Sequence, residues 1–121
     1  MRFHSDEGQL SLLDTSKADD MKRKADEWVR KNPEAWMRIR CEAVRRTEQK
    51  RRFGIGELCE QVRWHMHAEG VDDFKVNNTH LPIYARILAS DLPEVRPYVE
   101  LRTSVYDRFF PELGRSSRGT L

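Results

Sequence analysis

The 121-residue sequence predicts a mainly α fold: a compact helix-turn-helix or winged-helix-like domain of four to five helices with at most one short β-hairpin or strand. Two observations lead to this prediction. Apolar residues recur at the i, i+3, i+4, i+7 spacing of an amphipathic helix in several consecutive segments. Helix-capping residues, prolines and glycines separate those segments at short intervals. The chain length corresponds to a single domain.

The first helix is predicted over residues 17–31, where apolar residues lie at helical spacing. Ser16 followed by Asp19 resembles a capping box at its start. The apolar positions are Met21, Ala25, Trp28 and Val29. Residues 1–14 have neither a helix-start signal nor a long apolar face. We therefore expect a flexible N-terminal arm over residues 1–14 and a domain over residues 15–113.

The second and third helices follow clear start signals. Asn32-Pro33-Glu34 supplies an N-cap, a proline in the first turn and an acidic residue, and it predicts a helix from residue 33 to about residue 50. Its apolar positions are Trp36, Ile39, Ala43, Val44 and Thr47. After the Gly-containing segment 53–56, a third helix is predicted over residues 55–69, ending near Gly70. Its apolar positions are Ile55, Leu58, Cys59, Val62 and Met66.

The fourth helix is predicted over residues 78–91, after a turn of about seven residues in which Phe74 contacts the core. Pro82 in its first turn is tolerated because that position needs no N–H donor. Its apolar positions are Leu81, Tyr84, Ile87 and Leu88. Residues 98–103 alternate between apolar and polar, and two interpretations stay open, a β-strand or a last short helix. The polar tail 114–121 is expected to be disordered.

This order of helices is typical of a helix-turn-helix, and a strand after the last helix would make it winged. The fourth helix would enter a groove of duplex DNA, with base edges contacted by Asn77, Asn78, Thr79, His80 and Arg86. Phosphates would be neutralised by Arg51, Arg52 and Lys75. The alternative is structural: Asn78 or Thr79 only caps the helix, and Arg86 lies in water.

The distribution of charge supports both interpretations. The net charge is +2, but residues 17–52 hold thirteen Lys or Arg against seven acidic residues, a local charge of +6. Such a segment can follow a phosphate backbone, or it can simply keep its helices in solution. Residues 53–80 carry a local charge of −3, which argues against contact with DNA there.

Several short motifs occur in the second half of the chain. They are Gly54-Ile55, Val62-Arg63-Trp64, Phe74-Lys75-Val76-Asn77-Asn78, Tyr84-Ala85-Arg86 and Glu100-Leu101-Arg102. In this pattern the chain resembles a group of small uncharacterised proteins of phages and prophages, over about half of its length. The resemblance implies a phage-type origin and a compact helical domain. The resemblance implies no particular activity. The helix order, with the capping residues at the start of the fourth helix, suggests a phage- or prophage-type DNA-binding regulator or DNA-associated accessory factor.

A second motif, Gln9-Leu10-Ser11-Leu12-Leu13, lies in the predicted arm. It resembles the peptide by which bacterial replication and repair proteins dock on the DNA sliding clamp, with Leu13 in place of the usual Phe. Docking requires an extended segment, in which Gln9, Leu10, Leu12 and Leu13 would contact the partner. The alternative function is therefore a non-enzymatic protein-binding inhibitor or adaptor, anti-defence or replication-interfering in role. The alternative structure is an apolar stub packed on the first helix.

We expect no catalytic residues, no cofactor, no metal and no small-molecule substrate, because the sequence contains no motif that supplies them. His65 and His67 are two apart on a helix and point to different sides, and Cys41 and Cys59 lack the short spacing of a zinc site. No apolar run is long enough to span a membrane. With no signal-peptide core, and with cysteine usage that suits a reducing compartment, we expect a cytoplasmic location, the bacterial host cytoplasm if a phage encodes the protein.

Overall fold

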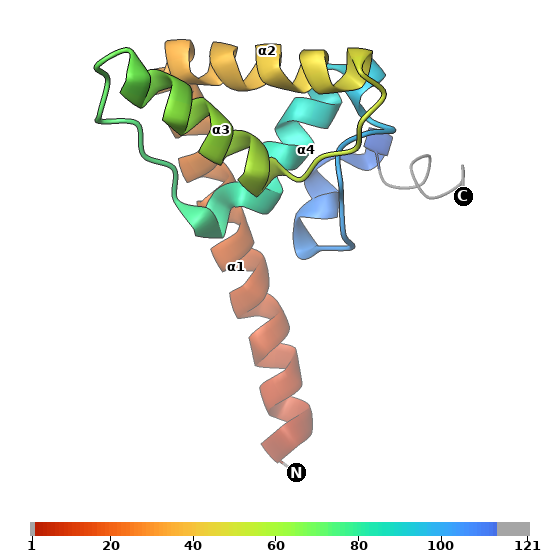
Figure 1. Ribbon diagram of the computed structural model, residues 1–121. Helices are drawn as coiled ribbons and strands as arrows, with labels where there is room; N and C mark the ends of the chain where they lie inside the picture. The colour runs from red at the N-terminus through yellow and green to blue at the C-terminus, as the bar shows by residue number, and fades with distance from the viewer. Residues whose placement is uncertain (1, 114–121) are drawn as a thin grey trace.

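The computed structural model describes the backbone of residues 2–113 and the side chains of residues 16–113, and its fold is mainly α, as predicted (Figure 1). The α-helices are α1 (Arg2–Lys31), α2 (Pro33–Glu48), α3 (Ile55–Ala68) and α4 (Leu81–Asp91). Three short 3-10 helices accompany them: η1 (Asn78–His80), η2 (Pro93–Val95) and η3 (Val105–Phe109). The predicted tail 114–121 lies outside the described residues. Within the described part, no helix is long and apolar enough to cross a membrane.

The structure differs from the sequence prediction in its first element. α1 begins at Arg2, so residues 2–14 are helical rather than a non-helical arm, and this half of α1 projects away from the other helices (Figure 1). No proline interrupts the segment, and extending an existing helix by one residue costs far less than starting a new one. The backbone of Gln9–Leu13 is therefore helical. The extended conformation expected for clamp docking would require this part of α1 to unwind.

The junction between α1 and α2 follows the predicted restart signal, with Pro33 in the first turn of α2. Asn32, however, does not cap α2 with its side chain. Its Nδ2 donates to the carbonyl oxygen of Trp28 at 2.8 Å, and its backbone N–H donates to the same oxygen at 2.9 Å. Asn32 therefore terminates α1, and the proline starts α2.

α2 and α3 end in the same way. In each, a residue with positive φ follows the last turn, and its N–H and the next N–H donate back to carbonyls of that turn. The residue is Gly70 after α3, with φ of 89°, but Lys50 after α2, with φ of 56°. Glycine adopts this conformation without steric cost, whereas a lysine is strained in it.

α4 occupies the centre of the domain and meets an aromatic cluster. Tyr84 is fully buried, and its ring lies 5.3 Å from that of Trp28 and 6.1 Å from that of Trp36, centroid to centroid. Phe74 packs edge-on against Trp28, as expected for a residue that contacts the core. The indole N–H of Trp28 also donates to the carbonyl oxygen of Lys75 at 2.9 Å, which fixes the loop after α3 against α1.

Residues 98–103 form neither of the two predicted elements. Val99 makes one isolated parallel bridge with Phe53, and in residues 2–113 there is no other strand pairing. A wing is therefore absent from the described part of the chain. The physical reason is that the segment between α2 and α3, which would have to pair with residues 98–103, has only a few residues around Phe53. It is too short to form a second strand. A helical turn follows later, in η3, where Ser104 and Asp107 form a capping box.

Candidate functional site

The residues predicted to read DNA do not form a recognition surface, because α4 is buried on almost every side. In α4 only Asp91 is exposed. The fully buried positions are Ile83, Tyr84, Ala85, Arg86, Leu88 and Ala89. A recognition helix must present a continuous exposed face to the groove. α4 offers no such face, so the position of this helix in the sequence order was predicted correctly but its exposure was not.

Arg86 is the clearest correction. It was expected on the outer face of the helix, but it is only 2% exposed. Its Nε donates to Asp107 Oδ1 at 2.7 Å, and its two Nη groups donate to the backbone carbonyl oxygens of Pro82 and Arg102. Arg86 therefore connects α4 to the C-terminal segment. Helical spacing could not predict the burial of Arg86, because the segment that contains its partners Arg102 and Asp107 lies about twenty residues further along the chain.

His80 is also buried, at 8% exposure, with its ring edge-on to Tyr84, so the prediction that it faces a groove is wrong as well. Burial lowers its pKa, since the charged imidazolium would lose its hydration. Asn77 is exposed, but its Oδ1 accepts hydrogen bonds from the backbone N–H and the hydroxyl of Thr79 at 2.9 and 2.7 Å. The capping role considered for Asn78 or Thr79 thus belongs to Asn77.

The other predicted nucleic-acid contacts are exposed and lie on two different loops. Arg51 and Arg52 are on the loop between α2 and α3, where the Arg51 Nη1 donates to Gln49 Oε1 at 3.2 Å. Lys75 and Asn78 follow α3. These residues are available to solvent, but α4, the helix that was expected to read bases beside them, is buried.

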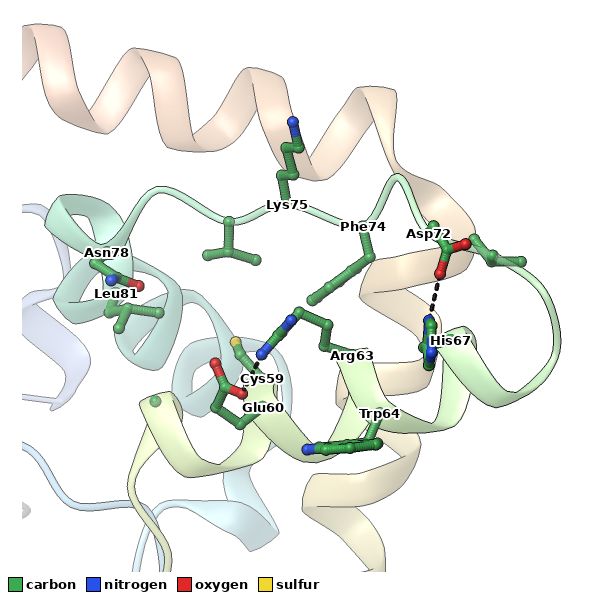
Figure 2. A pocket seen from close by; sticks show the side chains of 13 residues that line it. Cys59, Glu60, Arg63, Trp64, His67, Asp72, Phe74, Lys75, Asn78 and Leu81 are labelled. Atoms are coloured by element: carbon green, nitrogen blue, oxygen red, sulfur yellow. Dashed lines mark hydrogen bonds and ion pairs between the residues drawn. The ribbon is translucent and has the colours of Figure 1, made fainter.

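A pocket of about 610 Å³ lies instead between α3 and the loop of residues 71–78 (Figure 2). Its lining residues include the buried Cys59 and, in the first turn of α3, Gly56, together with Leu81 of α4. Phe74 reaches into it from the loop (Figure 2). Burial, followed by the charge of Glu60, raises the pKa of the Cys59 thiol to about 12, so this sulfur is not a nucleophile at neutral pH.

Trp64 lines this pocket and is 66% exposed, which is unusual for so large an apolar side chain. α3 buries the face predicted from its spacing, which includes Leu58, Val62 and Met66. Trp64 lies off this face and therefore points outward. Its ring lies edge-on to His67 with centroids 6.3 Å apart.

The polar residues around Trp64 form one exposed ion pair and one exposed hydrogen bond. The Nη2 of Arg63 donates to Glu60 Oε1 at 2.8 Å, and both side chains are more than half exposed. His67 Nδ1 donates to the carboxylate of Asp72 on the facing loop. Arg63 and Lys75 both line the pocket; in Figure 2 the Arg63 side chain lies between α3 and the loop, and the Lys75 side chain extends from the loop toward α1.

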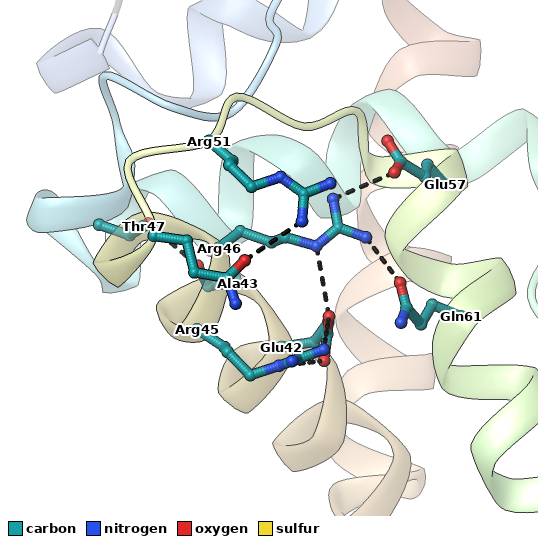
Figure 3. Close-up of polar contacts among 9 residues, drawn as sticks. Glu42, Ala43, Arg45, Arg46, Thr47, Arg51, Glu57 and Gln61 are labelled. Atoms are coloured by element: carbon teal, nitrogen blue, oxygen red, sulfur yellow. Dashed lines mark hydrogen bonds and ion pairs between the residues drawn. The ribbon is translucent and has the colours of Figure 1, made fainter.

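A buried polar cluster holds α3 in this orientation against α2 (Figure 3). The Arg46 side chain is 4% exposed and donates to Glu42, to Glu57 at 3.1 Å and to Gln61 at 2.6 Å. Because Glu57 and Gln61 are on α3, Arg46 joins the two helices through one guanidinium. The cluster fixes the rotation of α3 about its axis and hence the outward position of Trp64.

The pocket does not follow from the helical spacing of the sequence, although the sequence contains one signal for it. Trp64 lies outside the apolar spacing of its helix, and an indole on the polar side of an amphipathic helix is itself informative. Among the residues whose side chains are described, no group of three or more His, Cys, Asp and Glu could hold a metal ion. We found no match for the chain among protein-family models, curated proteins or solved structures.

Proposed function

We propose that the protein is a non-catalytic protein-binding module, and that the pocket beside Trp64 receives a segment of its partner. The observation that carries this proposal is the 66% exposure of Trp64 at the edge of the pocket. Tryptophan is enriched among the residues that dominate binding energy in protein interfaces. An indole that contributes little to the protein's own core is explained by a contact with another molecule.

The pocket also has a size and composition suited to a protein segment. Its volume of about 610 Å³ accommodates one or two side chains, and apolar groups such as Phe74 and Leu81 lie beside ionised ones. A central apolar anchor surrounded by polar groups is the usual composition of a protein interface.

A protein partner fits the charges better than duplex DNA does. The charged residues of 53–80 are all exposed, and they comprise five acids against two bases. DNA binding requires cations along the phosphate backbone, and these carboxylates would repel it. The burial of α4 removes the element that was expected to read bases.

The experiment is a selection from a random peptide display library on the full chain, followed by affinity measurements with the selected peptides. We expect Trp64→Ala to weaken binding by about tenfold or more, as for an interface anchor, with an unchanged melting temperature. Met37→Ala is the matched control, because Met37 is also apolar and is 57% exposed, but on α2. If the selection yields no peptide, or if Trp64→Ala binds as tightly as the original protein, the proposal is wrong.

A further inference from the structure

We propose that the partner's segment binds in an extended conformation, pairs its main chain with that of Phe74 and Val76, and places one side chain against Trp64. This inference rests on the proposed function and specifies how the partner is recognised. It follows from three features of the loop of residues 71–78: its strand-like alternation, its unpaired main-chain groups and its position beside the pocket.

The loop has the alternation of a β-strand although it belongs to no sheet. Residues 71–77 contain neither a helix nor a turn. The Asp72 carboxylate is hydrogen-bonded to α3 and Phe74 also points toward α3, whereas the Lys75 side chain extends toward α1 (Figure 2). Val76 lines the pocket and packs against the core. Successive side chains thus point to opposite faces, as they do in an extended strand.

The main chain of this segment has one unpaired edge. In an extended chain, the main-chain groups of neighbouring residues point to opposite edges. The carbonyl oxygen of Lys75 accepts the indole N–H of Trp28 at 2.9 Å, so the edge to which Lys75 points is held against α1. Phe74 and Val76 point to the other edge. Within the described residues, none of their N–H and C=O groups makes a hydrogen bond, so two donors and two acceptors remain for a partner strand.

Main-chain pairing also agrees with the balanced charge of the pocket. Of the Asp, Glu, Lys and Arg side chains that line it, two are acidic and two are basic, and each acid already has a partner. An added strand needs no charge, because main-chain hydrogen bonds supply its affinity and alternate side chains its specificity. The side chains on the pocket side would meet Trp64, Phe74, Val76 and Leu81, which favour an apolar residue there.

The test uses a peptide selected from the display library and a series of analogues, each with one main-chain amide replaced by an ester. The ester removes one N–H and leaves every side chain unchanged. Affinities for the full chain are measured by fluorescence anisotropy. We expect esters at every second residue of the bound segment to weaken binding about three- to tenfold, as the loss of one hydrogen bond does. The intervening esters should leave the affinity unchanged.

Proline substitution tests the same edge from the protein side. Val76→Pro removes an N–H that has no partner in the described residues, so it should weaken binding of the selected peptide about three- to tenfold. Val76→Ala keeps the N–H and measures the contribution of the side chain, and the two variants should have similar melting temperatures. Asp73→Pro is the control for the opposite edge and should leave the affinity unchanged. If Val76→Pro does not fold, the ester series on the unaltered protein decides.

Affinity losses at consecutive residues of the peptide, or at none, would overturn the inference, as would equal losses with Val76→Pro and Val76→Ala. So would a dimer that forms without peptide and is abolished by Val76→Pro, because the unpaired edge would then bind a second copy of the chain. If the inference fails while Trp64→Ala still weakens binding of the selected peptide, the proposed function stands. If no selected peptide requires Trp64, both fail.

Discussion

The burial of Arg86 makes a strong prediction about stability. Arg86→Met retains most of the aliphatic stem of the side chain but removes its guanidinium. Three hydrogen bonds are lost, of which the one to Asp107 is also an ion pair. The carbonyl oxygen of Pro82 remains within the hydrogen-bonded backbone of α4. The loss in free energy of unfolding therefore comes from Asp107 and from the carbonyl oxygen of Arg102, which lose their partner.

The magnitude follows from the exposure of these two groups. The Arg102 carbonyl oxygen loses a part-buried hydrogen bond from a charged group, and such bonds contribute about 1.5–3 kcal/mol. Breaking a fully buried ion pair costs about 3–5 kcal/mol, but the Asp107 side chain is 38% exposed and recovers part of its hydration. We therefore expect Arg86→Met to lower the free energy of unfolding by roughly 2–4 kcal/mol.

The assay is urea denaturation followed by circular dichroism, with Arg102→Met as the control. The Arg102 side chain is exposed, so its replacement should change the free energy of unfolding by less than about 0.5 kcal/mol. If Arg86→Met also lowers the free energy of unfolding by less than about 0.5 kcal/mol, the buried hydrogen-bond network is refuted. Arg86 would then be exposed, as its helical position predicted.

Three further predictions concern a strained turn, a thiol and a histidine. Because Lys50 has φ of 56°, Lys50→Gly should raise the free energy of unfolding by about 1 kcal/mol. Gly70→Ala, at φ of 89°, should lower the free energy of unfolding by a similar amount. Urea denaturation checks both variants, and changes in the same direction would contradict the turn geometry. Cys41 is exposed and should react with a thiol reagent at pH 8, while Cys59, with its pKa raised to about 12, should react only after unfolding. The pKa of His80 is lowered from 6.5 in the folded state, so the unfolded chain binds its proton more readily and stability should fall as pH drops below about 6.5. His80→Gln should reduce that slope, and an unchanged slope would show that other groups cause it.

The sequence predicted the positions of three helices well because their signals are local. The Asn32-Pro33 restart, the glycine after α3 and the apolar spacing of α3 all act within one or two helical turns. These signals set where α2, α3 and α4 begin and end to within a few residues.

The errors arose where distant segments decide the outcome. Helical spacing places Arg86 on the surface of α4, but Asp107 and the carbonyl oxygen of Arg102, which are distant in the sequence, bind its guanidinium. Residues 98–103 have strand-like alternation but find only Phe53 as a pairing partner. The pocket likewise depends on how the loop after α3 folds back along that helix, which Trp28 and Lys75 fix through a contact across 47 positions of the chain.

The most direct test of the account is a ¹H–¹⁵N correlation spectrum that follows the three tryptophan indole N–H signals during a peptide titration. The Trp28 indole N–H donates a hydrogen bond to the carbonyl oxygen of Lys75, and the Trp36 side chain is buried. Of the three tryptophans, Trp64 alone is exposed at the pocket, so its indole signal reports on binding there. We predict that a library-selected peptide shifts the Trp64 indole signal and leaves the other two in place. An unshifted Trp64 signal, together with shifts of residues 75–80 on addition of duplex DNA, would contradict the proposed function.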